Sequence, residues 1–194
     1  MTARAVTYGR GSARWGRFAR TLRTRTPARV AAPAGGRVLA TVLFTDLVSS
    51  TERAARAGDR AWADVLDRHL VTARAAVALH GGETVETTGD GLVAIFPGPG
   101  DGVRCAKRLV ADARELGLEL RSGLHAGEVE RTSDRIAGIA VHLAARIMGI
   151  ARAGEILVSR TVRDLVIGSE LTFAHRGEHE LKGIPDRWSV YALA

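Results

Sequence analysis

V-L-F-T-D-L-V-S-S-T, from Val42 to Thr51, is the stretch around which the rest of the chain is arranged. Its apolar, β-branched beginning is typical of a buried strand, which we expect over residues 38–46. That strand ends on a carboxylate, Asp46. Ser49 and Glu52 have the spacing of a capping box, which predicts that a helix begins at Ser49 or at a neighbouring residue.

A strand end that leads into a helix start combines two binding features. Asp46 can bind a hard cation, and the free N–H groups of the first helical turn can bind phosphate. An incidental carboxylate between a core strand and a capped helix explains this stretch equally well. The remainder of the chain must decide between these two interpretations.

The apolar spacing of the remaining chain predicts an alternation of helices and strands. Helices are expected at 59–80, 103–116, 139–150 and 159–166, and strands at 118–129, 155–158, 171–181 and 188–193. Two further β-rich runs within 83–96 are joined by Gly89-Asp90-Gly91. We expect 97–102 to be a loop and 134–138 a turn. This order predicts an α+β fold, a ferredoxin-like βαββαβ core with a C-terminal αβαββ extension and helices mainly on one face of the sheet.

Charge divides the 194-residue chain into two parts. Residues 1–36 contain eight Arg and no Asp, Glu or Lys, so removing them from the net charge of +7 leaves −1 for residues 37–194. We expect a catalytic domain at 37–194, preceded by a disordered Arg-rich tail or linker. The alternative is that the tail contacts nucleic acid or an anionic membrane, in which case binding would weaken steeply with salt.

Several classes of protein are not expected from this sequence. It has no apolar run of about 18 residues, which a transmembrane helix needs, and no apolar stretch of a secretory signal. The single Cys105 fits a buried side chain in the reducing cytoplasm. His69, His80 and His125 are expected to be core or contact histidines rather than metal ligands.

A second carboxylate occurs in a hairpin signal, where Gly89-Asp90-Gly91 joins two β-rich runs. Asp90 is either a simple turn residue or a partner of Asp46, because in the expected core the first strand lies beside this hairpin. Two carboxylates in close proximity repel each other unless cations neutralise them. The pair is therefore best explained by two Mg²⁺ or Mn²⁺ ions that assist a phosphoryl-type displacement.

Four motifs resemble the class III adenylate/guanylate cyclase catalytic domain of bacterial type. They are F-T-D-L-V-S-S-T at 44–51, T-T-G-D-G at 87–91, G-I-A-V-H-L-A-A-R at 138–146 and G-E-H-E-L-K-G-I-P at 177–185. Each is weak alone, but their order, spacing and position at strand ends make the resemblance specific. It covers roughly residues 38–193.

The resemblance implies a homodimer with composite active sites that converts ATP or GTP to the 3′,5′-cyclic monophosphate and pyrophosphate. It assigns the metal ligands to Asp46, Asp90 and the backbone of Leu47. The phosphates would be bound by Val48, Ser49, Ser50 and Thr51, with Lys182 as a looser match. Arg146, donated by the other subunit, would stabilise charge on the phosphates in the transition state.

The half of the site that selects the base and ribose departs from the family pattern. Glu86 stands at the position that is usually Lys in adenylate cyclases and Glu in guanylate cyclases. Arg135, with Asp134 one residue earlier, stands where adenylate cyclases usually have Asp. His142 replaces the asparagine that orients the ribose. Alternatively, Glu86 is an exposed strand residue, Arg135 a solvated turn charge and His142 a packing residue at the dimer interface.

Two functions from different classes follow. The first is a nucleotidyl cyclase for intracellular signalling, which Asp46, Asp90 and Arg146 favour. The second is a weak or inactive homologue that acts as a dimeric regulatory or nucleotide-binding module, which Glu86, Arg135 and His142 favour. The sequence alone does not select between ATP and GTP, although a Glu side chain can accept hydrogen bonds from guanine.

Overall fold

The computed structural model describes residues 36–132 and 135–194. The predicted Arg-rich tail, apart from Gly36, and Asp134 lie outside these residues. The strands are β1 (Gly36–Leu47), β2 (Glu83–Thr88), β3 (Gly91–Phe96), β4 (Leu120–Arg131), β5 (Ile136–Ala137), β6 (Ile156–Ser159), β7 (Phe173–Glu180) and β8 (Arg187–Leu193). The helices are α1 (Ser50–Ala57), α2 (Asp59–Leu79), α3 (Pro99–Glu115), α4 (Ile139–Gly149) and α5 (Arg160–Leu165).

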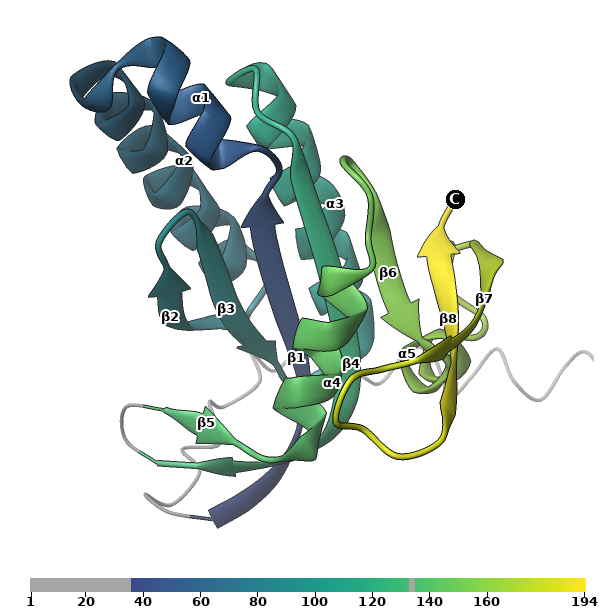
Figure 1. Cartoon of the computed structure of the whole chain (residues 1–194). Coiled ribbons are helices and arrows are strands. Elements are labelled where there is room, and N and C mark those ends of the chain that lie inside the picture. Colours follow the sequence, from purple (N-terminus) through teal and green to yellow (C-terminus); the bar gives the residue numbers. More distant parts are fainter. Residues whose placement is uncertain (1–35, 133–134) are drawn as a thin grey trace, which may run out of the picture. The chain divides into compact units, whose positions relative to one another are not determined.

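The strands form one mixed sheet in the order β2-β3-β1-β4-β6-β8-β7, with β5 paired to β4 (Figure 1). All neighbouring pairs are antiparallel except β4 and β6, which are parallel. The β1-to-β4 part is the predicted ferredoxin-like core, and β6, α5, β7 and β8 form the predicted extension. The expected α+β fold is therefore confirmed.

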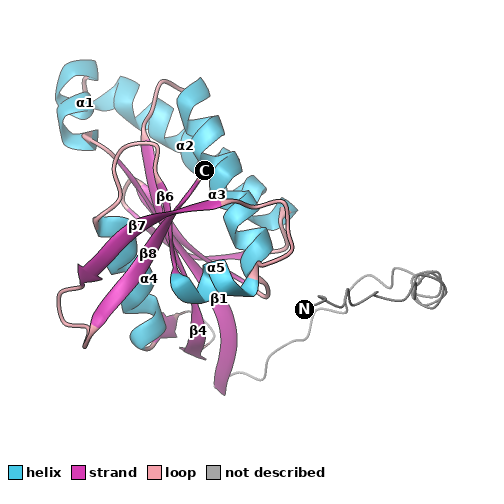
Figure 2. Cartoon of the chain, turned by 90° about the vertical axis from the view of Figure 1, so that its right-hand side faces the viewer, coloured by secondary structure: helices cyan, strands magenta, loops and turns pink. Residues whose placement is uncertain are grey.

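Alternation along β1 directs its side chains to opposite faces of the sheet. Leu43 belongs to a core cluster that includes residues of α2, α3 and α5, whereas Val42 belongs to a second cluster with α4. Figure 1 shows α4 in front of the sheet and α2 and α3 behind it, and Figure 2 gives the view turned by 90°. Three helices thus cover one face, and α4 crosses the other.

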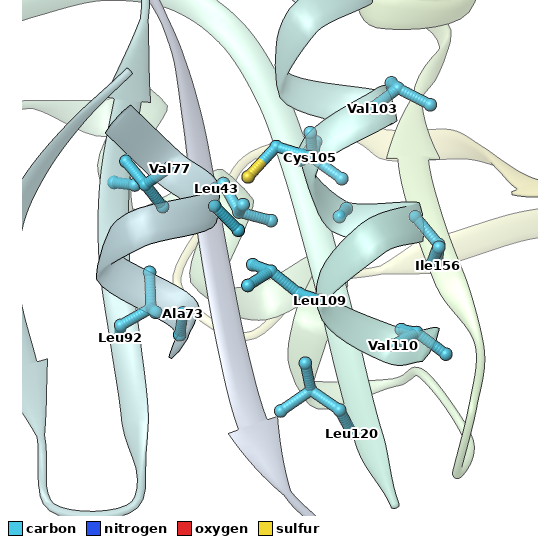
Figure 3. Close-up of a cluster of buried hydrophobic side chains, with 14 of the residues drawn as sticks. Leu43, Ala73, Val77, Leu92, Val103, Cys105, Leu109, Val110, Leu120 and Ile156 are labelled. Atoms are coloured by element: carbon cyan, nitrogen blue, oxygen red, sulfur yellow. The ribbon is translucent and has the colours of Figure 1, made fainter. Parts of the chain in front are cut away.

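The face beneath α2 and α3 is closely packed. Figure 3 shows Leu43 of β1 among side chains from both helices, including Val77 and Leu109. Cys105 is fully buried in this layer, and burial raises the pKa of its thiol to about 12. This agrees with the interpretation of Cys105 as a buried side chain, because a thiol of that pKa stays protonated near neutral pH.

The structure corrects three local expectations. Helix α3 begins at Pro99, within the segment expected to be a loop, because proline is well tolerated in the first turn. Residues 136–137, expected as a turn, form β5. Ser49 does precede α1, but its side chain makes no capping hydrogen bond, since its backbone is left-handed with φ of 57°.

Within residues 36–132 and 135–194, the structure has no helix that is both long and apolar enough to span a membrane.

Candidate functional site

Asp46 and Arg121 lie directly opposite each other on β1 and β4. The Nε of Arg121 donates a hydrogen bond to Asp46 Oδ2 over 2.9 Å, and a terminal guanidinium nitrogen contacts the same oxygen. Both side chains are partly exposed, at 32% for Arg121 and 26% for Asp46. The carboxylate at the end of β1 is therefore accessible to solvent and already paired with a cation.

Asp90 occupies the two-residue turn between β2 and β3, as the hairpin signal predicted. Gly89 enables this turn with φ of 70°. Because Thr45 pairs with Leu92 across β1 and β3, Asp46 lies one residue beyond the end of that ladder, beside the turn. The register thus brings the two predicted metal ligands to the same end of the sheet.

Glu86 faces the same side of the sheet as Asp46. It pairs with Val93 of β3, which in turn pairs with Phe44 of β1. Directly paired residues share a face, and Phe44 lies two residues from Asp46. The Glu86 side chain is exposed, so it is available to a molecule bound over this face.

The predicted phosphate loop follows Asp46 at once. Leu47 pairs with Leu120 of β4, and the Val48 N–H donates to the Glu119 carbonyl over 2.8 Å. The Val48 amide is thus already engaged in a hydrogen bond to the chain just before β4. Ser49, Ser50 and Thr51 lie at the start of α1, where N–H groups of the first turn lack helical acceptors.

Helix α4 lies directly against β4 because β4 has a glycine there. A Cβ on Gly123 would lie 2.1 Å from the Met148 backbone nitrogen and 2.7 Å from the Ala144 carbonyl oxygen. The buried side of α4 is apolar, while His142 and Arg146 are exposed. Within the described part of the chain, no hydrogen bond or ion pair joins either side chain to Asp46, Asp90 or Glu86.

Arg146 contacts the connection between β7 and β8. Its Nε donates a hydrogen bond to the backbone carbonyl of Lys182 over 3.1 Å, and the Lys182 side chain is exposed. The third and fourth sequence motifs therefore meet in space, although 36 residues separate the two side chains.

Arg135 lies beside the β4–β5 hairpin. It lines a hollow between β2 and the β4–β5 hairpin together with Glu83, Val85 and Arg131. Arg131 binds both carboxylate oxygens of Glu83, over 2.7 and 2.8 Å. Glu86 does not line this hollow, and among the described residues no hydrogen bond or ion pair joins it to Arg135.

Two histidines are buried, as the sequence predicted. His125 of β4 forms a hydrogen bond between Nδ1 and Ser159 Oγ over 2.8 Å, and burial lowers its pKa to about 4. Burial also lowers the pKa of His69 and outweighs the opposing effects of Asp90 and Asp112. Both rings are therefore neutral near pH 7 and belong to the core.

The domain that carries these residues matches a known protein family. Residues 36–194 match the family model of the adenylate and guanylate cyclase catalytic domain. The chain belongs to this family. The resemblance inferred from the four motifs is thus confirmed for the whole described domain.

Curated relatives of the cyclase domain occur in several bacteria. A putative adenylate cyclase of Rhizobium meliloti is 31% identical over 56% of this chain and 20% of its own length. A serine/threonine-protein kinase of Myxococcus xanthus is 30% identical over 78% of this chain and 19% of its own. An uncharacterized protein of Mycobacterium tuberculosis is 31% identical over 59% and 41%. The chain thus spans less than half the length of these relatives.

Solved cyclase structures share the fold. The adenylyl cyclase CyaB of P. aeruginosa superposes with a TM-score of 0.78, at 22% identity, over 82% of this chain and 95% of that one. The guanylyl cyclase Cya2 gives 0.77, at 24% identity, over 83% and 94%. An adenylate/guanylate cyclase/hydrolase of Silicibacter pomeroyi gives 0.70, at 27% identity, over 82% and 98%.

The predicted site of the cyclase domain thus divides into two groups within one chain. Asp46, Asp90 and Glu86 lie on the sheet, while Arg146, His142 and Lys182 lie on or beside α4. Arg121 was missed by sequence reasoning. The alternating pattern of β4 includes Arg121. Its pairing with Asp46, however, depends on the register between two strands, and the two residues are 75 positions apart in the sequence.

Proposed function

We propose that this cyclase domain converts a purine nucleoside triphosphate to its 3′,5′-cyclic monophosphate and pyrophosphate in a homodimer with composite sites. One observation supports the proposal. Asp46 and Asp90 lie at one end of the sheet, and Arg146 lies separately from them on the exposed side of α4. A site that needs both groups is completed most simply by a second copy. The ribose 3′-hydroxyl attacks the α-phosphorus and loses its proton, and pyrophosphate leaves.

The two carboxylates at this end of the sheet fit two divalent cations. Asp46 and Asp90 provide hard carboxylate oxygens, and Asp46 already attracts a positive group, Arg121. Among the described residues no cluster of three or more His, Cys, Asp or Glu is present. Mg²⁺ is commonly bound by one or two carboxylates together with substrate phosphates. When bound, such ions would neutralise charge on the attacking and leaving oxygens.

The chain's own residues would bind and orient the nucleotide. The amides of Ser49, Ser50 and Thr51 lie three to five residues after Asp46, at the start of α1, and suit a phosphate group. Glu86, exposed on the same face as Asp46, can accept hydrogen bonds from the guanine N1–H and amino group, whereas adenine offers an acceptor at N1. This chemistry favours GTP over ATP.

Arg146 would act on the substrate held by the other copy. Its guanidinium projects from α4 and is available to stabilise the negative charge that develops on the phosphates. His142 lies one helical turn before it on the same exposed surface and has a ring nitrogen able to donate to a ribose oxygen. The Lys182 side chain is a further candidate for phosphate contact.

One observation favours the second candidate, a dimeric regulatory or nucleotide-binding module. Asp46 is already neutralised by Arg121, so the site can be stable without metal. If Arg121 holds Asp46 too firmly, nucleotide would bind without being cyclised.

Incubation of the full chain with Mn²⁺ and either ATP or GTP tests the proposal. We expect a cyclic product, more from GTP than from ATP, that disappears in Asp46→Ala. Bound nucleotide with no product from either substrate would support the regulatory module instead. Mixing Asp46→Ala with Arg146→Ala chains should restore part of the activity, because mixed dimers contain one intact site. Absence of recovery would contradict the composite site.

A further inference from the structure

Arg146 is oriented by the backbone of the β7–β8 connection. Its Nε donates to the Lys182 carbonyl over 3.1 Å. Within the described residues its two terminal nitrogens have no hydrogen-bond partner. Because the guanidinium is planar and rigid, fixing Nε also fixes the direction of the two terminal nitrogens.

The Lys182 carbonyl is itself held in a tight turn. The Ile184 N–H donates to the Leu181 carbonyl over 2.9 Å, which closes a four-residue turn. Gly183, the third residue of this turn, has φ of 79°. A positive φ at this position is the signature of a type II turn and favours glycine. Gly183 thus determines where the Lys182 carbonyl points.

Side chains of the same turn pack on the helix that carries Arg146. Leu181 is 4% exposed and lies in one apolar cluster with Leu143 and Ile147 of α4, and Ile184 packs against this cluster. Figure 1 shows the β7–β8 connection beside α4. The turn and the helix therefore form one packed unit.

We propose that the turn Leu181–Ile184 is a positioning element for the reaction, with the Lys182 backbone carbonyl as the group that orients Arg146. This inference rests on the proposed function for the role of Arg146, but it assigns a separate part to the backbone of Lys182. The turn itself does not contact the substrate in this role. It acts by presenting the arginine in one orientation.

Gly183 allows a selective test because a side chain there meets no atom within 4 Å. A substitution therefore acts through backbone conformation alone. Gly168, between α5 and β7, is the matched control, since it has φ of 90° and is equally free of neighbours. Gly183→Val and Gly168→Val should lose similar stability, because β-branched residues strongly disfavour positive φ. Gly183→Asn should retain the stability that Gly183→Val loses, because asparagine tolerates positive φ.

At equal folded fraction in the full chain, Gly183→Val should lower kcat and kcat/KM together by about tenfold or more, as expected for a misplaced catalytic group. For Gly168→Val and Gly183→Asn, kcat and kcat/KM should stay close to the values of the unsubstituted protein. In mixed dimers, Gly183→Val should recover activity with Asp46→Ala but not with Arg146→Ala. Equal kcat for the two valine variants, or recovery with Arg146→Ala, would overturn the inference.

Hydrogen exchange of the Arg146 Nε–H, followed by NMR and assigned by its loss in Arg146→Lys, separates this inference from the proposed function. Exchange should be slow in the unsubstituted protein and in Gly168→Val, and faster in Gly183→Val. Unchanged exchange in Gly183→Val would overturn the positioning role. Slow exchange in an unsubstituted protein that lacks cyclase activity would overturn the proposed function. It would still support the orientation of Arg146 by the Lys182 carbonyl.

Discussion

Arg121 and Asp46 face each other across β4 and β1, joined by two contacts to one carboxylate oxygen. This pairing makes Arg121 a competitor of any cation that binds Asp46. Because like charges repel, a metal ion can approach Asp46 fully only when the guanidinium moves away.

Replacing Arg121 should therefore strengthen metal binding in the absence of nucleotide. For Arg121→Gln we expect Mn²⁺ to bind about five- to tenfold more tightly, which corresponds to about 1 kcal/mol of removed repulsion. The free energy of unfolding without metal should fall by no more than about 1 kcal/mol, because the pair is partly exposed. Titration calorimetry with Mn²⁺ measures the first effect and urea unfolding the second.

Arg131→Gln is the matched control for this change. Arg131 also belongs to β4, has the same 32% exposure and pairs with Glu83 away from Asp46. It should alter stability to a similar extent and leave Mn²⁺ affinity unchanged. Equal Mn²⁺ affinity in Arg121→Gln and the unsubstituted protein would show that Arg121 does not compete for Asp46.

Substitution of Glu86 should change the choice of base. Glu86→Gln can donate to adenine N1, and it leaves the guanine donors less well paired. A mispaired buried polar group costs about 1–3 kcal/mol, so the ratio of kcat/KM for GTP to that for ATP should fall by roughly 5- to 150-fold. Rates of cyclic product from each nucleotide measure this ratio. An unchanged ratio would show that Glu86 is an exposed strand residue that does not select the base.

Gly123 should be intolerant of any side chain. In Gly123→Ala the new Cβ would overlap backbone atoms of Met148 and Ala144, which cannot move without displacing α4. We expect a loss of about 3 kcal/mol or more in the free energy of unfolding. Activity should fall further than the folded fraction, because α4 carries Arg146. Chemical denaturation and product assays on the same samples separate the two losses.

The control for Gly123→Ala is Gly149→Ala at the end of the same helix. A Cβ on Gly149 meets no atom within 4 Å, and alanine favours helix by about 0.5–1 kcal/mol over glycine. Gly149→Ala should therefore be neutral or slightly stabilising. If both alanine variants were equally stable, the close approach of α4 to β4 would be wrong.

The stability of the domain should decrease in acid, in part through His125. Its pKa is lowered by burial from 6.5 to about 4, so the unfolded chain takes up a proton that the folded ring does not. Stability is therefore unaffected above about pH 6.5 and falls as the pH drops toward 4, by roughly 3 kcal/mol at most for this group. His69, whose pKa is also lowered, adds to the same trend.

Urea unfolding at pH 7.5 and pH 5.0 measures this dependence. His125→Asn keeps a side chain that can hydrogen-bond Ser159 but does not titrate, so its loss of stability between the two pH values should be smaller. An identical loss in both proteins would exclude His125 as a source of the acid sensitivity.

The family and the fold could be predicted from the order of local signals along the chain, and so could the positions of Asp46 at a strand end and Asp90 in a hairpin turn. The G-D-G hairpin fixed Asp90, and the β-branched run fixed the strand before Asp46. The pairing between segments that are distant in the sequence could not be predicted from these signals. The expected strand at 118–129 is β4 at 120–131, and an error of two residues is enough to hide which β4 residue faces Asp46.

Short elements were missed for a related reason. The two residues of β5 are too few to show any periodicity, and they form a strand because β4 offers free backbone groups beside them. The hydrogen bond from Arg146 to Lys182 involves a backbone carbonyl, which every residue type possesses. A side-chain pattern therefore carries no signal for it.

The alternation along β1 has a consequence for how this domain can vary. Leu43, Thr45 and Leu47 face the closed helical layer or its edge, whereas Val42, Phe44 and Asp46 face the side crossed by α4. In a deep mutational scan, substitutions at Val42 and Leu43, which are buried on opposite faces, should both cause loss of folded protein. Asp46, between the buried Thr45 and Leu47, should instead lose catalysis with the fold retained. The alternation at the end of this one strand would then be visible in a genetic experiment, with no structure in hand.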